Sequence, residues 1–148
     1  MASGTMKWFR GGLRRFLDGS IDYTTNTIKV ALHTSAYTAS SDGDDYYSEG
    51  PGAAQVSGTG YTYGGAALGT KSINVATARI ARLIAADPSW ASSYISAKGA
   101  VVYASTAAST TSPLICYVAF DATTTSSNGT FTLDLDGTNG FLYLRASV

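Results

Sequence analysis

Nucleophilic catalysis would depend on two residue types that each occur once in the chain. His33 is the single histidine and Cys116 the single cysteine. A Ser–His–Asp triad would need His33 as its base, yet the sequence contains no Gly-x-Ser-x-Gly nucleophile elbow. His33 shares the polar face of a predicted strand with Lys29, so we expect an exposed histidine. Cys116 has the neighbours Ile115 and Tyr117, which favour a buried and unreactive thiol.

A second candidate is an acidic run with the oxygen ligands that hard cations prefer. Asp42-Gly43-Asp44-Asp45 is followed by Glu49, but the spacing of a calcium-binding loop is absent. A solvated loop is therefore the expectation, and no metal or other cofactor is predicted. The adjacent Tyr46 and Tyr47 favour a contact loop, because tyrosine is enriched in protein interfaces.

Other candidate motifs are incomplete. Asp134 and Asp136 alternate along one predicted strand, whereas glycosidase carboxylates face each other across a cleft. We expect this pair to protect the edge of a hairpin. The glycines around residues 58–65 lack the Gly-Lys-Ser/Thr ending of a phosphate loop. Asn128-Gly129-Thr130 matches a glycosylation sequon, which has meaning only in a secretory pathway. We therefore expect a protein that is not an enzyme.

The composition of the chain excludes several further classes of protein. The 148 residues carry ten cationic and ten acidic side chains, and charged residues make up only 14%. A neutral chain is unsuited to general nucleic-acid binding, and a weakly charged surface offers little repulsion against association. One cysteine excludes an internal disulfide, and no apolar run is long enough to span a membrane. Arg14 and Arg15 interrupt any signal-peptide core. We expect a protein made in a reducing cytoplasm, with no membrane or nucleic-acid partner.

Two elements near the start of the chain are expected to position the candidate residues: an N-terminal helix and the strand that follows it. Met6–Asp18 has helical periodicity, with the apolar side chains Phe9, Leu13, Phe16 and Leu17 on one arc and the basic side chains Lys7, Arg10, Arg14 and Arg15 on the other. Gly11 and Gly12 weaken this helix, so it needs a surface on which to pack. Thr27–Thr34 then alternates as a strand.

The remainder predicts further strands and one long irregular segment. Residues 37–70 are too long for an ordinary connection. Thr77–Ala86 fits a helix or a strand, and residues 123–130 are predicted as a turn-rich break. Residues 131–135 and 141–145 form a hairpin candidate.

The predicted fold class is mainly β, an antiparallel sandwich or barrel-like domain over residues 20–148 after a basic amphipathic arm at 1–19. Strands are also predicted at Ser72–Val75, Tyr94–Ser105 and Leu114–Phe120.

The order of several short motifs resembles a group of small virion structural proteins of tailed bacteriophages. No single motif is specific, but together they cover most of the chain from Leu17 to Leu144. The motifs are Leu17-Asp18-Gly19, Ile21-Asp22-Tyr23, Thr27–Leu32, Thr34–Thr38, Val56–Thr62 followed by Gly64-Gly65, Asp87–Trp90, Ala97–Tyr103, Ser112–Ile115 and Ser126, Asn128 and Gly129.

This resemblance implies an all-β, non-enzymatic subunit that decorates or joins parts of the virion, and a strand at 80–86. The expected function is capsid decoration (a cement protein) in the virion, assembled in the host cytoplasm as a homo-oligomer, with a trimer as the expected form. Neck or tail placement and a carbohydrate-binding module remain alternatives. The expected partners are the major capsid protein or other virion proteins. The expected contact residues are Arg10, Arg14, Arg15, Tyr46 and Tyr47.

Overall fold

The protein is mainly β, with two antiparallel sheets and one short N-terminal helix, as the sequence predicts. The computed structural model describes residues 4–77 and 79–145. Residues 1–3 of the predicted arm, residue 78 of the ambiguous segment and residues 146–148 lie outside the described part. The sheets do not close into a barrel within the described residues. The elements are β1 (Lys7–Trp8), α1 (Arg10–Leu17), β2 (Ile28–His33), η1 (Tyr47–Glu49), β3 (Ala66–Ala67), β4 (Ser72–Thr77), β5 (Ile80–Ile84), β6 (Ser89–Ala104), η2 (Ser109–Thr111), β7 (Leu114–Thr132) and β8 (Leu142–Arg145).

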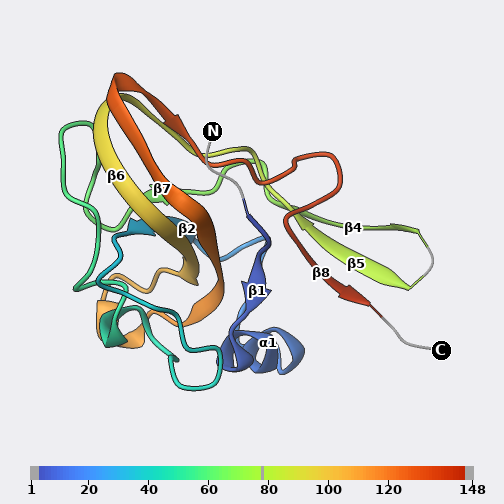
Figure 1. The fold of residues 1–148 in the computed structure, drawn as a ribbon. Coiled ribbons are helices and arrows are strands. Elements are labelled where there is room, and N and C mark those ends of the chain that lie inside the picture. Colours follow the sequence, from blue (N-terminus) through green and yellow to red (C-terminus); the bar gives the residue numbers. More distant parts are fainter. Residues whose placement is uncertain (1–3, 78, 146–148) are drawn as a thin grey trace.

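A five-stranded sheet with the order β1-β7-β6-β2-β3 forms the body of the molecule. Its longest members, β6 and β7, pair as a curved antiparallel ribbon whose register shifts at several bulges (Figure 1). The second sheet, with the order β4-β5-β8, lies beside it. We call the β4–β5 hairpin (72–84) and β8 (142–145) the wing.

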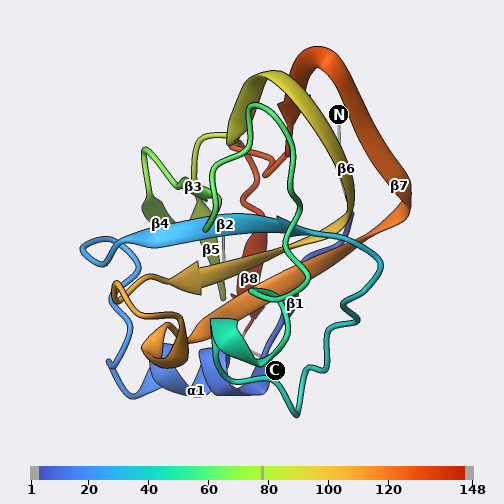
Figure 2. The same cartoon turned by 90° about the vertical axis from the view of Figure 1, so that its left-hand side faces the viewer.

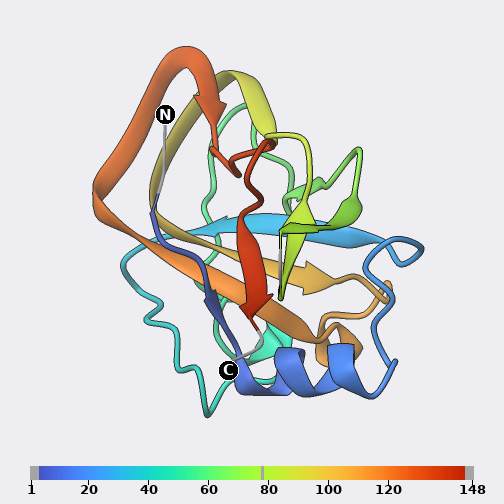
Figure 3. The same cartoon turned by 90° about the vertical axis from the view of Figure 1, so that its right-hand side faces the viewer.

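Both faces of the five-stranded sheet are covered around β2, and all residues of this strand except Lys29 are buried. One face packs against the wing around Val30, Val102 and Leu83. The wing lies in front of this face in Figure 3. The opposite face is covered by the long segment between β2 and β3, which runs across the sheet in Figure 2. Tyr37 and Tyr47 from this segment complete a second cluster there.

The long strands correct three sequence predictions. Ile95 and Val101 belong to different clusters, although simple alternation places them on one side. A register shift between Ala97 and Gly99 exchanges the faces. Residues 123–130 are not a break, because β7 continues through them. The predicted terminal hairpin is also wrong, since β8 pairs with β5.

The N-terminal helix is shorter than predicted. It begins at Arg10, and Lys7–Trp8 instead forms β1, which pairs with β7 at Tyr117 and Cys116. The predicted apolar face is only partly correct: Phe9 is fully buried, but Leu17 is 75% exposed. The ambiguous segment forms strand β5 rather than a helix.

The predicted burial of Cys116 is confirmed, because its side chain is inaccessible within the first cluster and desolvation raises the thiol pKa. A thiol reagent should therefore label the native protein slowly and the denatured protein rapidly. Cys116→Ser should lower the free energy of unfolding by about 1–3 kcal/mol, because a hydroxyl would be desolvated. Fast labelling of the folded protein would contradict this placement.

Candidate interaction site

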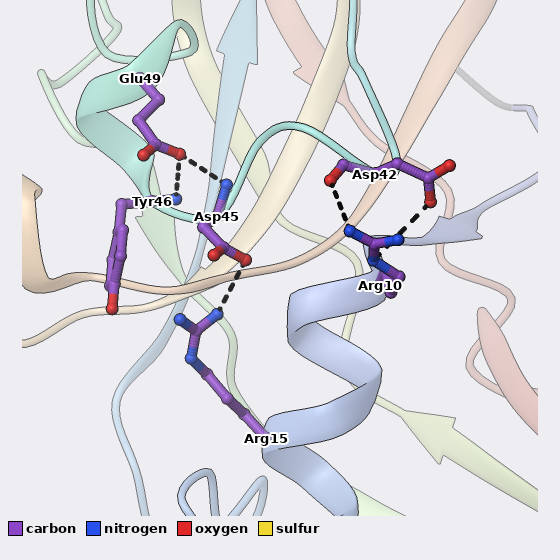
Figure 4. A network of polar contacts seen from close by, with 6 residues as sticks. All are labelled: Arg10, Arg15, Asp42, Asp45, Tyr46 and Glu49. Atoms are coloured by element: carbon purple, nitrogen blue, oxygen red, sulfur yellow. Dashed lines mark hydrogen bonds and ion pairs between the residues drawn. The ribbon is translucent and has the colours of Figure 1, made fainter.

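The basic helix and the acidic loop, which the sequence separates by some thirty residues, contact each other (Figure 4). Arg15 Nη1 lies 3.4 Å from Asp45 Oδ1, and the guanidinium carbon lies 4.8 Å from the centre of the Tyr46 ring. Arg10 Nη2 donates to the Asp42 carbonyl at 3.2 Å, and its Nε lies 4.0 Å from the Asp42 carboxylate. We call residues 42–49 the acidic loop.

Two glycines permit this contact. A Cβ at Gly12 would lie 2.6 Å from the Leu114 carbonyl oxygen and 2.7 Å from Ile115 Cα, so only glycine lets α1 approach β7 this closely. A Cβ at Gly11 would strike the Asp45 carboxylate and lie 2.9 Å from Arg15 Nη1. The glycines that weaken the helix by propensity are thus the residues that allow it to dock.

Within the acidic loop, carboxylates hold the backbone in place. Glu49 Oε2 accepts the amides of Asp45 at 2.5 Å and Tyr46 at 2.8 Å. Asp44 Oδ2 accepts the Tyr37 hydroxyl at 2.7 Å and the Ser40 amide at 2.9 Å. Burial of Tyr37 is the largest cause that raises the pKa of its hydroxyl. The hydrogen bond to Asp44 and the negative charge of Asp44 raise this pKa further. The loop is therefore ordered by its own carboxylates.

These contacts correct part of the predicted interaction surface. Arg15 is 7% exposed and Tyr47 is 2% exposed, so neither lies on a contact surface. Arg10 is exposed but contacts Asp42 of its own chain. The sequence predicts that a second protein supplies acidic partners for the basic helix. For Arg10 and Arg15, the acidic loop of the same chain supplies them instead. Arg14 is exposed and Tyr46 is partly exposed, and their role in contacts stays a prediction.

His33 is buried, which corrects its predicted exposure. Its ring lies edge-on to Tyr37 at 4.9 Å between centroids, and Nδ1 is 3.0 Å from the Thr34 carbonyl oxygen. The partner across the strand pair is Gly99, where a Cβ would lie 2.5 Å from Nε2. Glycine therefore makes room for the imidazole. Desolvation lowers the His33 pKa, although the bond to Thr34 opposes this shift.

The buried His33 predicts a loss of stability in weak acid. An unfolded histidine has a pKa of about 6.5. Because the folded protein resists protonation of His33, the unfolded chain binds more protons below this pH. The free energy of unfolding should be highest above pH 6.5 and decrease as the pH falls to 5. Chemical denaturation at pH 7.5 and pH 5.5 measures the change. His33→Asn should remove most of it, and an equal pH dependence in this variant would contradict the assignment.

Asp134 and Asp136 do not protect a hairpin edge, because they lie in the connection between β7 and β8. Asp134 Oδ1 accepts the Asp136 amide at 2.9 Å, and Asp136 Oδ1 accepts the Asn139 amide at 3.0 Å. The backbone and side-chain bonds from Asn139 lower the Asp136 pKa. Both carboxylates line a cavity of about 390 Å³ beside Trp8. They organise a turn, and the predicted role at an edge is wrong.

The outer face of the wing is a feature that the sequence predictions missed. Cross-strand pairs place Arg82 beside Tyr143 and Ile80 beside Arg145, all on one face. These four residues line a hollow of about 440 Å³ together with Asp136, Asn139 and Gly140. Tyr143 is 62% exposed. The alternation of Tyr143 and Arg145 along β8 indicates that both side chains lie on one face of a strand. The sequence does not indicate that this strand pairs with β5.

No group of three or more His, Cys, Asp or Glu residues is arranged to hold a metal ion within 4–77 and 79–145. No helix in the same ranges is long and apolar enough to cross a membrane. Comparison with protein-family models, curated proteins and solved structures finds no match for this chain.

Proposed function

We propose that this protein is a non-enzymatic structural subunit of a tailed-phage virion that decorates and stabilises the capsid. The observation that carries the proposal is the wing, which presents apolar and cationic side chains beyond the body of the molecule. Ile73 is 48% exposed and Val75 is 66% exposed. Tyr143 lies on the face opposite Ile73, because it pairs with Arg82 and Ile73 pairs with Leu83. Apolar, tyrosine and arginine groups of this kind are typical of surfaces that are covered in an assembly.

The ordered sequence motifs described above support a virion role, and the weakly charged surface supports association. The helix–loop contact favours a rigid subunit, because a segment of more than thirty residues is held against the sheet by tyrosines and carboxylates. A rigid docking surface loses little conformational entropy on binding. Neck or tail attachment would use the same properties, so the choice of the capsid rests on the sequence resemblance.

The docking surface includes the exposed face of α1 in this proposal. Among the described residues Arg14 forms no ion pair, in contrast to Arg10 and Arg15. Arg14→Glu should preserve the fold and weaken binding to virus particles that lack this subunit, more strongly at low salt, because screening reduces the contribution of exposed charges. Many copies on a shell would amplify a small change in each contact through avidity.

A cosedimentation assay with particles and purified protein measures this effect. Lys7→Glu makes the same change of charge at an exposed residue of β1, outside α1, and serves as the matched control. Equal binding of wild type, Arg14→Glu and the control would remove α1 from the docking surface. Failure of the wild-type protein to bind any particle would argue against the decoration role.

A carbohydrate-binding function is a second candidate, favoured by the cavity of about 390 Å³ that Trp8, Tyr143 and Asp134 line. Aromatic faces beside carboxylates are chemically suited to sugar rings. Titration with host-surface polysaccharide, followed by tryptophan fluorescence, tests it. A saturable signal lost in Asp134→Ala would support this function over a purely structural one.

A further inference from the structure

The wing carries positive charge only. Its residues include three arginines, Arg79, Arg82 and Arg145, and no carboxylate. The whole chain has ten charges of each sign, which leaves seven cationic and ten acidic residues outside the wing. None of the three arginines takes part in an ion pair within the described ranges. One end of the molecule is therefore cationic and the remainder has a net negative charge.

The cationic end has the form of a binding surface. Arg82, Tyr143 and Arg145 share the outer face of the wing with Ile80 and line the hollow of about 440 Å³. Arginine and tyrosine dominate the energetic centres of protein interfaces, where a planar guanidinium can bind a carboxylate through two hydrogen bonds. One carboxylate, Asp136, also lines the hollow, where it accepts hydrogen bonds from Asn139 and the Arg82 charge helps to lower its pKa. Among the described residues no ion pair joins Asp136 to Arg82 or Arg145, so both guanidinium groups retain donors for an external acidic group.

The complementary surface is present on the same chain. The acidic loop has four carboxylates, Asp42, Asp44, Asp45 and Glu49, against two arginines from α1. The Asp42 side chain is 76% exposed and that of Asp45 is 50% exposed, so both retain accessible oxygens. The loop therefore keeps a net negative charge after its internal pairs are counted.

We propose that the outer face of the wing binds the acidic loop of a second copy of this chain. The contact joins two different surfaces, so it is head-to-tail, and a dimer still presents one free wing on one copy and one free acidic loop on the other. Such heterologous contacts produce rings when the rotation closes. The inference goes beyond the proposed function, since it concerns contacts between copies in solution and does not require a virus particle.

Sedimentation velocity of the full chain over a range of concentrations tests this contact. The wild type should self-associate, and added NaCl should weaken the association. The wing variant, Arg82→Glu with Arg145→Glu, should lose at least about tenfold in affinity, because it places like charges against the loop. The loop variant, Asp42→Lys, should also weaken association. Asp121→Lys, an equal charge change elsewhere on the body, should leave it unchanged.

Mixing the two variants gives the decisive result. The loop variant retains an intact wing and the wing variant retains an intact acidic loop. An equimolar mixture should form a one-to-one dimer with near wild-type affinity, although each variant alone remains monomeric at that concentration. In a two-fold contact of wing with wing, or of loop with loop, one of the two variants would still self-associate, because its contact surface is unchanged. If the double wing variant is unfolded by circular dichroism, Arg145→Glu alone replaces it, because Arg145 is exposed.

Two results would overturn the proposal. A wild type that remains monomeric at all concentrations and salt levels would exclude the contact, and so would a mixture that does not associate. Either result leaves the virion proposal standing, since binding to particles is measured separately.

Discussion

Gly65→Ala is expected to lower the free energy of unfolding by about 3 kcal/mol or more. Gly65 has φ +75°, and an added Cβ would overlap the Val30 carbonyl oxygen and lie 2.6 Å from its carbon and 2.7 Å from Ala31 Cα. These are backbone atoms of the central strand β2, so they cannot move aside as a flexible side chain would. Overpacking of this kind costs about 1–3 kcal/mol, and the left-handed conformation adds about 1 kcal/mol.

Gly19→Ala is the matched control, because Gly19 has φ +80° and no atom lies within 4 Å of the position that a Cβ would take. This variant should show only the conformational cost of about 1 kcal/mol. Urea unfolding of both variants separates the two effects. Equal losses would show that the segment before β3 does not pass as closely over β2 as described.

Arg15→Ala is expected to lower the free energy of unfolding by about 2 kcal/mol. The variant removes a buried guanidinium together with its contacts to Asp45 and the Tyr46 ring. Truncating one member of a buried pair costs about 3–5 kcal/mol. We expect less here, because the Asp45 side chain is half exposed and water would solvate it in the variant.

Arg14→Ala, on the exposed side of the same helix, should change stability by no more than about 0.5 kcal/mol. A double-mutant cycle with Asp45→Asn should give a coupling energy of about 1 kcal/mol with Arg15 and none with Arg14. Equal effects of the two arginine variants would mean that α1 presents a different face to the acidic loop.

Local patterns in the sequence predicted the elements better than their partners. Alternation placed β2 correctly, and the burial of Cys116 followed from its apolar neighbours. The same alternation failed in β6, because a bulge near Gly99 exchanges the two faces. It also failed for His33, whose burial depends on a glycine in another strand. Local pattern contains no information on pairings of this kind between distant segments.

The interaction site shows the same limit. The basic helix and the acidic loop were each recognised from composition, but their contact with each other was not. That contact depends on Gly11 and Gly12, which by propensity only weaken a helix. The charged outer face of the wing was missed because Arg82 and Tyr143 become neighbours only through the pairing of β5 with β8.

The virion proposal is tested most directly by quantitative mass spectrometry of purified particles of the phage that this proposal takes as the source of the chain. The proposal predicts that the protein remains with particles through a density gradient, at a constant number of copies per major capsid subunit. Particles emptied of DNA and freed of tails should retain it at the same ratio. Absence from gradient-purified particles, with abundant protein in the infected-cell lysate, would contradict a structural role in the virion.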